Sequence, residues 1–196
     1  RCLVGSEMCI RDRLAATCFS MATFADEEFT TYEPTAENVK LLGRTYYNGE
    51  SLWFSLTNSG VEYQFTGTAT KITVSGDANA VSATDGARIA VFADGERVKD
   101  TMLTFNPQTL TVNLEEGTHT IKLLKISESA NGSIFIDDIS VNGEGAITPT
   151  AAKKHSIEFI GDSITCGYGI DSKNENEHFS TFTEDGSRTV SYTHLR

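Results

Sequence analysis

Cysteine is scarce in this sequence, and its absence from the central part decides how that part must be stabilised. The 196 residues contain four cysteines, and Cys18 and Cys166 flank a long central block that has none. No pair follows the C-x-x-C spacing, and no histidine lies at the distance typical of a zinc finger. A disulfide framework is therefore not expected, so a hydrophobic core has to stabilise the chain.

Positive charge and long apolar runs are lacking as well. Only 16 Lys and Arg residues oppose 27 Asp and Glu residues, which gives a formal charge of −11 and a pI near 4.8. Nucleic-acid binding requires clustered Lys and Arg, so the composition argues against a nucleic-acid partner. No apolar stretch is long enough to span a membrane. The composition is compatible with a soluble extracellular protein or with a neutral ligand.

The two ends of the chain share one DNA pattern. Residues 6–12, SEMCIRD, can be written TCG GAG ATG TGT ATA AGA GAC, and the reverse complement of this DNA encodes VSYTHLR, residues 190–196. One element read on opposite strands therefore accounts for both ends, and it resembles the transposon-end adapter of sequencing-library preparation. We interpret residues 1–13 and 189–196 as adapter-like, so we expect them to contribute nothing to the fold. On this interpretation the chain is a fragment of a longer protein.

The stretch that follows the first adapter-like segment is typical of a signal peptide. Residues 14–25, LAATCFSMATFA, are small and apolar, and an acidic stretch begins at Asp26. This pattern predicts a truncated signal peptide, cleaved before Asp26, and hence a secreted or periplasmic protein. An apolar first strand and a lipoprotein anchored through Cys18 are the alternatives, although Thr17 is bulky for the position before a lipidated cysteine.

Short apolar runs separated by turns fill residues 33–142. Apolar and polar residues alternate in 88–92 and 110–114, as in half-buried strands. Asp94-Gly95 predicts a two-residue hairpin, and Gly117 predicts another turn. Many short strands with regular turns indicate a two-sheet β-sandwich. The residues expected in its strands, at least half of them buried, are Val91, Phe92, Val112, Leu114, Ile121, Leu123, Phe135 and Ile136.

Two features of this region allow two interpretations each. Trp53, the only tryptophan, precedes Phe54, and neighbours in a strand face opposite ways, so one of them can face outward and stack on a sugar. We favour Trp53 in the core with Phe54 partly covered. Asp137 and Asp138 suggest a calcium site or a solvated strand edge. We favour the edge, because calcium requires several converging oxygen ligands.

The character of the sequence changes after a linker at 143–154, GEGAITPTAAKK. The apolar run HSIEFIG begins at His155, and DSITCGYG follows directly. A buried strand that leads into a loop and a helix is how an α/β domain begins. We therefore expect residues 155–188 to form the first βα unit of a second, truncated domain.

Gly161-Asp162-Ser163 at the end of this run resembles the nucleophile block of the SGNH (GDSL-like) hydrolases. By itself the tripeptide also fits an ordinary helix N-cap. The longer context, FIGDSITCGYG followed by FSTFTEDGSRT, resembles the acetylxylan esterases of carbohydrate esterase family two. That family has a jelly-roll β-sandwich, a short linker and then an SGNH hydrolase domain. The resemblance covers residues 39–188.

The resemblance implies a serine esterase that deacetylates plant polysaccharides such as xylan. Ser163 matches the nucleophile and a backbone oxyanion donor, and Gly161 and Asp162 match its supporting residues. The catalytic histidine and the other oxyanion donors belong to later blocks that this chain lacks, so we expect the fragment to be inactive. The family implies no cofactor and no metal, and its partner is an acetylated polysaccharide or oligosaccharide.

Other residues near the serine are weaker candidates. Glu175-x-x-His178 imitates the family's acid-x-x-His spacing, but it follows Ser163 too closely, so we interpret His178 as a polar loop residue. Cys166 fits a small buried residue better than a second nucleophile. The alternative function for the whole chain is a non-catalytic carbohydrate-binding β-sandwich attached to another enzyme.

The adapter-like interpretation predicts that the codons for residues 2–13 and 190–196 do not adjoin this gene in genomic DNA. Sequencing an independent clone across both ends tests this. The same codons found next to the gene in such a clone would contradict the interpretation.

Overall fold

Antiparallel strands supply most of the regular structure in residues 28–193, the part of the chain that the computed structural model describes. The strands are β1 Phe29–Tyr32, β2 Lys40–Leu42, β3 Thr45–Tyr47, β4 Leu52–Phe54, β5 Gly60–Gly76, β6 Arg88–Ala93, β7 Glu96–Met102, β8 Gln108–Lys125, β9 Ile134–Asn142 and β10 Thr148–Pro149. The helices are short: α1 Ser163–Cys166, α2 Val190–Thr193 and 3-10 turns at Ser129–Asn131, Thr181–Thr183 and Gly186–Arg188. None of these helices is long and apolar enough to cross a membrane.

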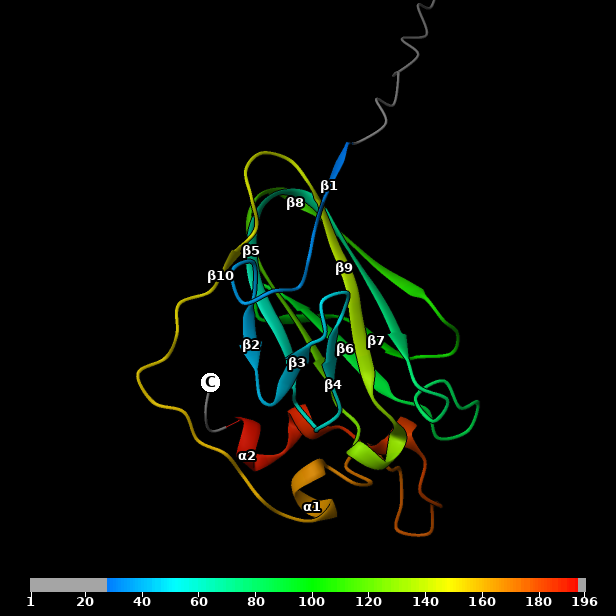
Figure 1. The fold of residues 1–196 in the computed structure, drawn as a ribbon. Helices are drawn as coiled ribbons and strands as arrows, with labels where there is room; N and C mark the ends of the chain where they lie inside the picture. The colour runs from blue at the N-terminus through cyan, green and yellow to red at the C-terminus, as the bar shows by residue number, and fades with distance from the viewer. Residues whose placement is uncertain (1–27, 194–196) are drawn as a thin grey trace, which may run out of the picture.

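The strands are ordered β3-β4-β9-β5-β8-β6-β7, with β1 beside β9 and with β2 and β10 beside β5. The strands of this part of the chain pair in antiparallel fashion. The strands curve around one interior, and α1 and α2 lie together at one end of the sandwich (Figure 1). The predicted β-sandwich is therefore confirmed.

The predicted turn at Gly117 is wrong, because β8 continues through it. Gly117 pairs with Gly67 of β5, and the register then jumps to a pair between Ala69 and Asn113. The two long strands thus bend together rather than ending. Asn142 fixes the bend, since its side-chain oxygen accepts hydrogen bonds from the backbone N–H groups of Thr68 at 2.9 Å and Ala69 at 2.6 Å. The hairpin at Asp94-Gly95 is confirmed between β6 and β7, where both residues have positive φ.

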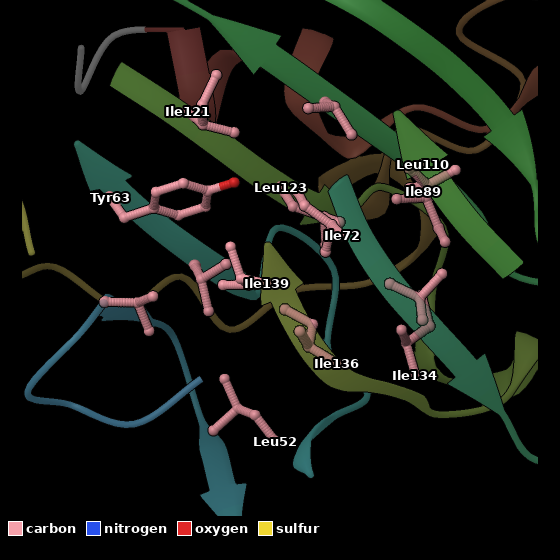
Figure 2. Packing of buried hydrophobic residues seen from close by; sticks show 14 of the residues in the cluster. Leu52, Tyr63, Ile72, Ile89, Leu110, Ile121, Leu123, Ile134, Ile136 and Ile139 are labelled. Carbon is pink, nitrogen blue, oxygen red and sulfur yellow. The ribbon is translucent and has the colours of Figure 1, made fainter. Parts of the chain in front are cut away.

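Most of the core is one large cluster of aliphatic and aromatic side chains (Figure 2). A second, small cluster contains Ala90, Phe92, Leu124 and Ile126. Six of the eight residues expected in the strands are buried, and Leu114 and Phe135 are half-buried. The favoured placement of Trp53 is wrong: Phe54 is the fully buried residue, and Trp53 faces outward beside Phe135 and Tyr46. Strand alternation requires opposite directions for the pair but does not say which residue faces the core.

Asp137 and Asp138 lie on β9, which pairs with β5 on one side. On its other side β4 pairs only as far as Ile136 and β1 only from Ile139, so this side of the two aspartates is unpaired, as at a strand edge. The side chain of Asp137 accepts a hydrogen bond from Ser75 at 2.9 Å, and that of Asp138 accepts one from Thr73 at 3.1 Å. Each carboxylate therefore has its own hydroxyl partner on β5.

The strand expected at 155–160 is not formed. These residues have no regular structure, and Ile157, Phe159 and Ile160 are 61%, 51% and 91% exposed. The apolar side chains of this segment are therefore not covered by a sheet. A buried parallel strand needs partners on both sides, and none lies beside this segment within residues 28–193.

The adapter-like and signal-peptide assignments concern the ends of the chain. Residues 1–13 and 14–25 lie outside the described part. At the other end, residues 190–193 form α2, and Tyr192 packs against a small cluster on the sandwich that contains Phe92 and Leu124. The assignment of 189–196 stays a prediction about the DNA.

The opposite directions of Phe54 and Trp53 predict unequal effects of truncation. Phe54→Ala should lower the free energy of unfolding by about 3–5 kcal/mol, because it leaves a cavity in the core. Trp53→Ala should cost less, since its side chain is already partly in water. Urea denaturation of both variants measures the difference, and a larger loss for Trp53→Ala would contradict the placement.

Candidate functional site

Ser163 is the first residue of α1 and is exposed. Asp162 caps this helix, since its side chain accepts a hydrogen bond from the backbone N–H of Ile164 at 3.0 Å. A Cβ at Gly161 would lie 2.0 Å from Oγ1 of Thr165, so only glycine fits there without displacement. Asp162 thus caps the helix, and Ser163 Oγ takes no part in the cap.

The helix that carries Ser163 ends against a later part of the chain. Gly167 closes α1 with φ 82°, and its backbone N–H donates to the carbonyl groups of Ile164 and Ser163. Its own carbonyl accepts a hydrogen bond from the backbone N–H of Asp185 at 3.2 Å. A Cβ at Gly167 would lie 2.3 Å from the Asp185 carbonyl oxygen, so the two backbones pack directly together.

The other residues singled out near the serine are not assembled into a triad. His178 is exposed, in agreement with a polar loop residue. Cys166 is half-buried, and burial raises the pKa of its thiol, which makes it a poorer nucleophile. Another histidine, His119 of β8, is bound elsewhere, since it contacts Asp94 of the β6–β7 hairpin at 2.7 Å. Within residues 28–193, no histidine is hydrogen-bonded to Ser163.

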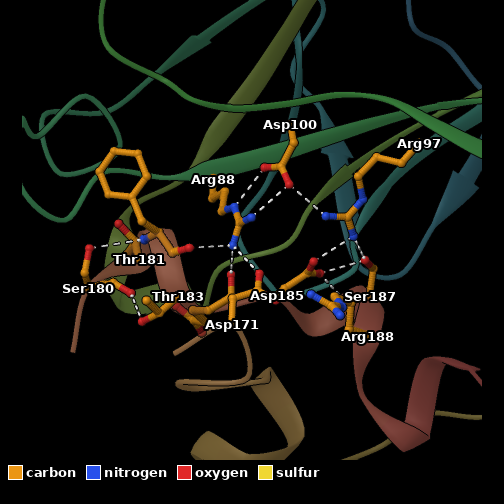
Figure 3. A network of polar contacts seen from close by, with 12 residues as sticks. Arg88, Arg97, Asp100, Asp171, Ser180, Thr181, Thr183, Asp185, Ser187 and Arg188 are labelled. Carbon is orange, nitrogen blue, oxygen red and sulfur yellow. Dashed lines mark hydrogen bonds and ion pairs between the residues drawn. The ribbon is translucent and has the colours of Figure 1, made fainter. Parts of the chain in front are cut away.

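Sequence reasoning missed a network of charged residues that joins the sandwich to the segment after α1 (Figure 3). Arg88 of β6 binds both oxygens of Asp100 of β7, at 2.8 Å each. Its remaining terminal nitrogen donates to Asp171 at 3.0 Å, to the carbonyl of Phe182 at 2.9 Å and to the carbonyl of Glu184 at 3.0 Å. The one available signal is a charged residue within the apolar run ARIAVFA, all of which is buried.

Arg97 of β7 forms the second half of this network. It contacts Asp100 at 2.8 Å and the carboxylate of Asp185 at 2.7 Å, and it also donates to the hydroxyl of Ser187. Burial alone would raise the pKa of Asp100, but the two arginines hold it below its ordinary value. Asp100 is therefore charged and shared between both arginines.

Backbone contacts fix the same segment to the sandwich at Gly186. Its N–H donates to the carbonyl of Ile126 at 2.8 Å, and its carbonyl accepts a hydrogen bond from the side chain of Asn58 at 2.9 Å. A Cβ at Gly186 would lie 2.1 Å from a methyl carbon of Thr57, so this approach requires glycine.

A second group of ionisable side chains is buried between the sandwich and the end of α1. Lys125 is fully buried, and its ammonium donates to the carbonyls of Ser127 and Glu128. Burial lowers the pKa of Lys125 to about 8. Burial, together with the charge of the nearby Glu128, raises the pKa of Glu184 to about 7. One oxygen of Glu184 accepts from the Glu128 N–H at 2.8 Å, and the other is buried without a hydrogen bond.

Glu128, Cys166 and Glu184 also qualify by ligand type as a metal site. One ligand atom from each lies within 4.8 Å of the others. Lys125 shares these surroundings, and its ammonium repels a bound cation. The two carboxylates and the ammonium instead form a cluster of opposite charges beside the Cys166 thiol.

A family model described as Carbohydrate esterase 2 N-terminal matches residues 41–151. Cellulase/esterase CelE of Acetivibrio thermocellus is 30% identical over 131 residues, which are 66% of this chain and 15% of that protein. The chain thus covers a small part of this curated relative.

Two solved structures of family two carbohydrate esterases are similar to this chain. The structure from Cellvibrio japonicus has a TM-score of 0.74 and 19% identity, covering 85% of this chain and 48% of its own. The structure from Clostridium thermocellum in complex with cellohexaose has a TM-score of 0.65 and 26% identity, covering 79% of this chain and 46% of its own. The chain therefore spans about half the length of these esterases.

The raised pKa of Glu184 predicts a pH-dependent stability. Between the ordinary carboxyl value of 4.5 and about 7, the folded state holds a proton that the unfolded state has lost. The free energy of unfolding must therefore fall as pH rises through this window. Urea midpoints at pH 5 and pH 7 should differ less in Glu184→Gln than in the unmodified chain. Glu175→Gln, at an exposed position, is the control, and an equal change in both variants would contradict the assignment.

Proposed function

The chain belongs to the carbohydrate esterase 2 N-terminal family, and we propose that it is the N-terminal part of an exported esterase that removes acetyl groups from plant polysaccharides such as xylan. The observation that carries this proposal is the geometry of Gly161-Asp162-Ser163: a capped turn that leaves the serine exposed. The close packing of Gly161 and the cap by Asp162 account for both neighbours of the serine, so each residue of the block has a function in it.

The proposed reaction is acyl transfer through Ser163. Its Oγ forms a bond to the acetyl carbonyl carbon while a histidine of the complete enzyme accepts the hydroxyl proton. Backbone N–H groups, that of Ser163 first, stabilise the negative oxygen of the tetrahedral intermediate. The sugar hydroxyl leaves with that proton, and water then releases acetate from the serine by the same steps in reverse order.

We further propose that residues 155–160 form the first strand of the hydrolase domain in the complete protein. Ile157, Phe159 and Ile160 are the apolar face that neighbouring parallel strands would cover. Ser163 would then stand at the carboxyl end of that strand, where α/β sheets bind their ligands.

A neutral, acetylated polysaccharide or oligosaccharide is the proposed substrate. The charge of −11 does not oppose a neutral polymer, and the related esterase of Clostridium thermocellum binds cellohexaose. Such polymers lie outside the cell, which agrees with the proposed export through the segment 14–25.

A second candidate function is carbohydrate binding by the sandwich itself. Tyr46, Trp53 and Phe135 are consecutive cross-strand neighbours on the outward face of β3, β4 and β9, and Tyr46 is 65% exposed. Aromatic faces of this kind can stack on sugar rings. This candidate requires no serine chemistry, so the two functions are separable by substitution.

The esterase proposal predicts a strict dependence on Ser163. The complete gene product should hydrolyse p-nitrophenyl acetate, and Ser163→Ala should reduce the rate to background, because no other nucleophile replaces the hydroxyl. The 196-residue chain alone should show negligible hydrolysis. Ser129→Ala, at an exposed serine of the sandwich, is the control and should keep the full rate.

A complete gene product that keeps its rate after Ser163→Ala would overturn the choice of nucleophile. A complete gene product without esterase activity that binds xylan, and loses binding after Trp53→Ala, would support the second candidate instead.

A further inference from the structure

We propose that the sandwich positions the nucleophile, and that Arg97 and Asn58 are positioning residues of the esterase, which rests on the function proposed above. Neither residue approaches the reacting atoms. They hold the backbone at 185–186, which in turn holds the end of the helix that begins at Ser163.

The first step of this connection is polar and buried. Asp185 is fully buried, and Arg97 lies 2.7 Å from its carboxylate. Arg97 is itself held by Asp100, which also binds Arg88 in bidentate fashion. A planar guanidinium with two fixed partners has little freedom, so it determines where the Asp185 carboxylate lies.

The second step passes through backbone hydrogen bonds. Gly186 is bound on its N–H side by Ile126 and on its carbonyl side by Asn58, both of them sandwich residues. The adjacent Asp185 N–H donates to the carbonyl of Gly167. A Cβ at Gly167 would lie 2.3 Å from the Asp185 carbonyl oxygen, and one at Gly186 would lie 2.1 Å from a methyl carbon of Thr57, so both close approaches require glycine.

The third step reaches the serine. Gly167 N–H donates to the carbonyls of Ile164 and Ser163, and the N–H of Tyr168 donates to the Ser163 carbonyl at 2.9 Å. The single turn of α1 is too short to be stable by itself in water. Its contacts at 167–168 and at 185 therefore supply the support that an isolated turn lacks.

A matched arginine contact is available as a control. Arg44 of the sandwich binds Glu158 at 2.9 Å, but both side chains are more than half exposed, at 73% and 55%. Exposed ion pairs contribute little. Arg44 thus forms an arginine–carboxylate ion pair between the sandwich and the segment before Ser163, as Arg97 does with Asp185. The Arg44 ion pair, however, is exposed and is not adjoined by buried backbone hydrogen bonds.

The first experiment uses the 196-residue chain. Hydrogen exchange should be faster at the amides of Asp185 and Gly186 in Arg97→Gln, whereas Arg44→Gln should leave it unchanged. Asn58→Gly is a second variant that leaves no buried charge unpaired and keeps the left-handed backbone at this position, where φ is 60°. It should loosen the same amides. Unchanged exchange at both amides in both variants would overturn the proposal.

The second experiment uses the complete gene product with p-nitrophenyl acetate, and the number of reactive serines is titrated with a phosphonate. Misplacement of a reacting group by about 1 Å costs on the order of 100-fold. We expect kcat per titrated serine to fall about 10- to 100-fold in Arg97→Gln and Asn58→Gly, with KM nearly constant. A role in stability alone would lower the number of reactive serines and leave kcat per serine unchanged, which would overturn the proposal.

The two proposals fail in different ways. Activity that survives Ser163→Ala, with Arg97 intact, contradicts the esterase function, and Ser163 then has no role for the sandwich to support. If activity depends on Ser163 but kcat per titrated serine is unchanged in Arg97→Gln and Asn58→Gly, only the positioning proposal is contradicted.

Discussion

A guanidinium buried in the wall of a β-sandwich must find acceptors on every side, and Arg88 is such a group. It is 9% exposed, and its partners come from two places: Asp100 on the neighbouring strand, and Asp171 with two carbonyls from the segment after α1. All three partners of its Nη1 come from that segment, whereas Nε and Nη2 bind Asp100 within the sandwich. The sandwich and the later segment are therefore coupled, although 150–162 between them has little regular structure.

The sequence predicts the fold where local patterns are sufficient. Alternation identified the strands, and Asp94-Gly95 identified a hairpin because two positive φ angles are needed there. The prediction of a turn at Gly117 was wrong for a physical reason. Glycine is suited to a bend within a strand as well as to a turn between strands, and only the pairing of Gly117 with Gly67 shows that the strand continues. The predicted direction of Trp53 was wrong because alternation along a strand requires neighbouring side chains to face opposite ways but does not say which of them faces the core.

For the candidate site, the sequence indicated only those residues that are neighbours along the chain. Gly161, Asp162 and Ser163 form one short block, so their arrangement follows from neighbouring residues and from the resemblance to a family. Arg88 and Asp171 are far apart in sequence, and no periodicity relates them. The strand expected at 155–160 needs neighbours as well, because an apolar run forms a parallel strand only where other strands pair with it.

The exposed stretch 150–162 has both of its ends fixed, with β10 paired to β5 on one side and α1 docked on the other. It therefore acts as a tether. A short tether raises the effective concentration of the docking segment to the order of millimolar. The contacts between the two parts then need only modest intrinsic affinity, which is why charged and backbone groups suffice where two separate molecules would need a large apolar interface.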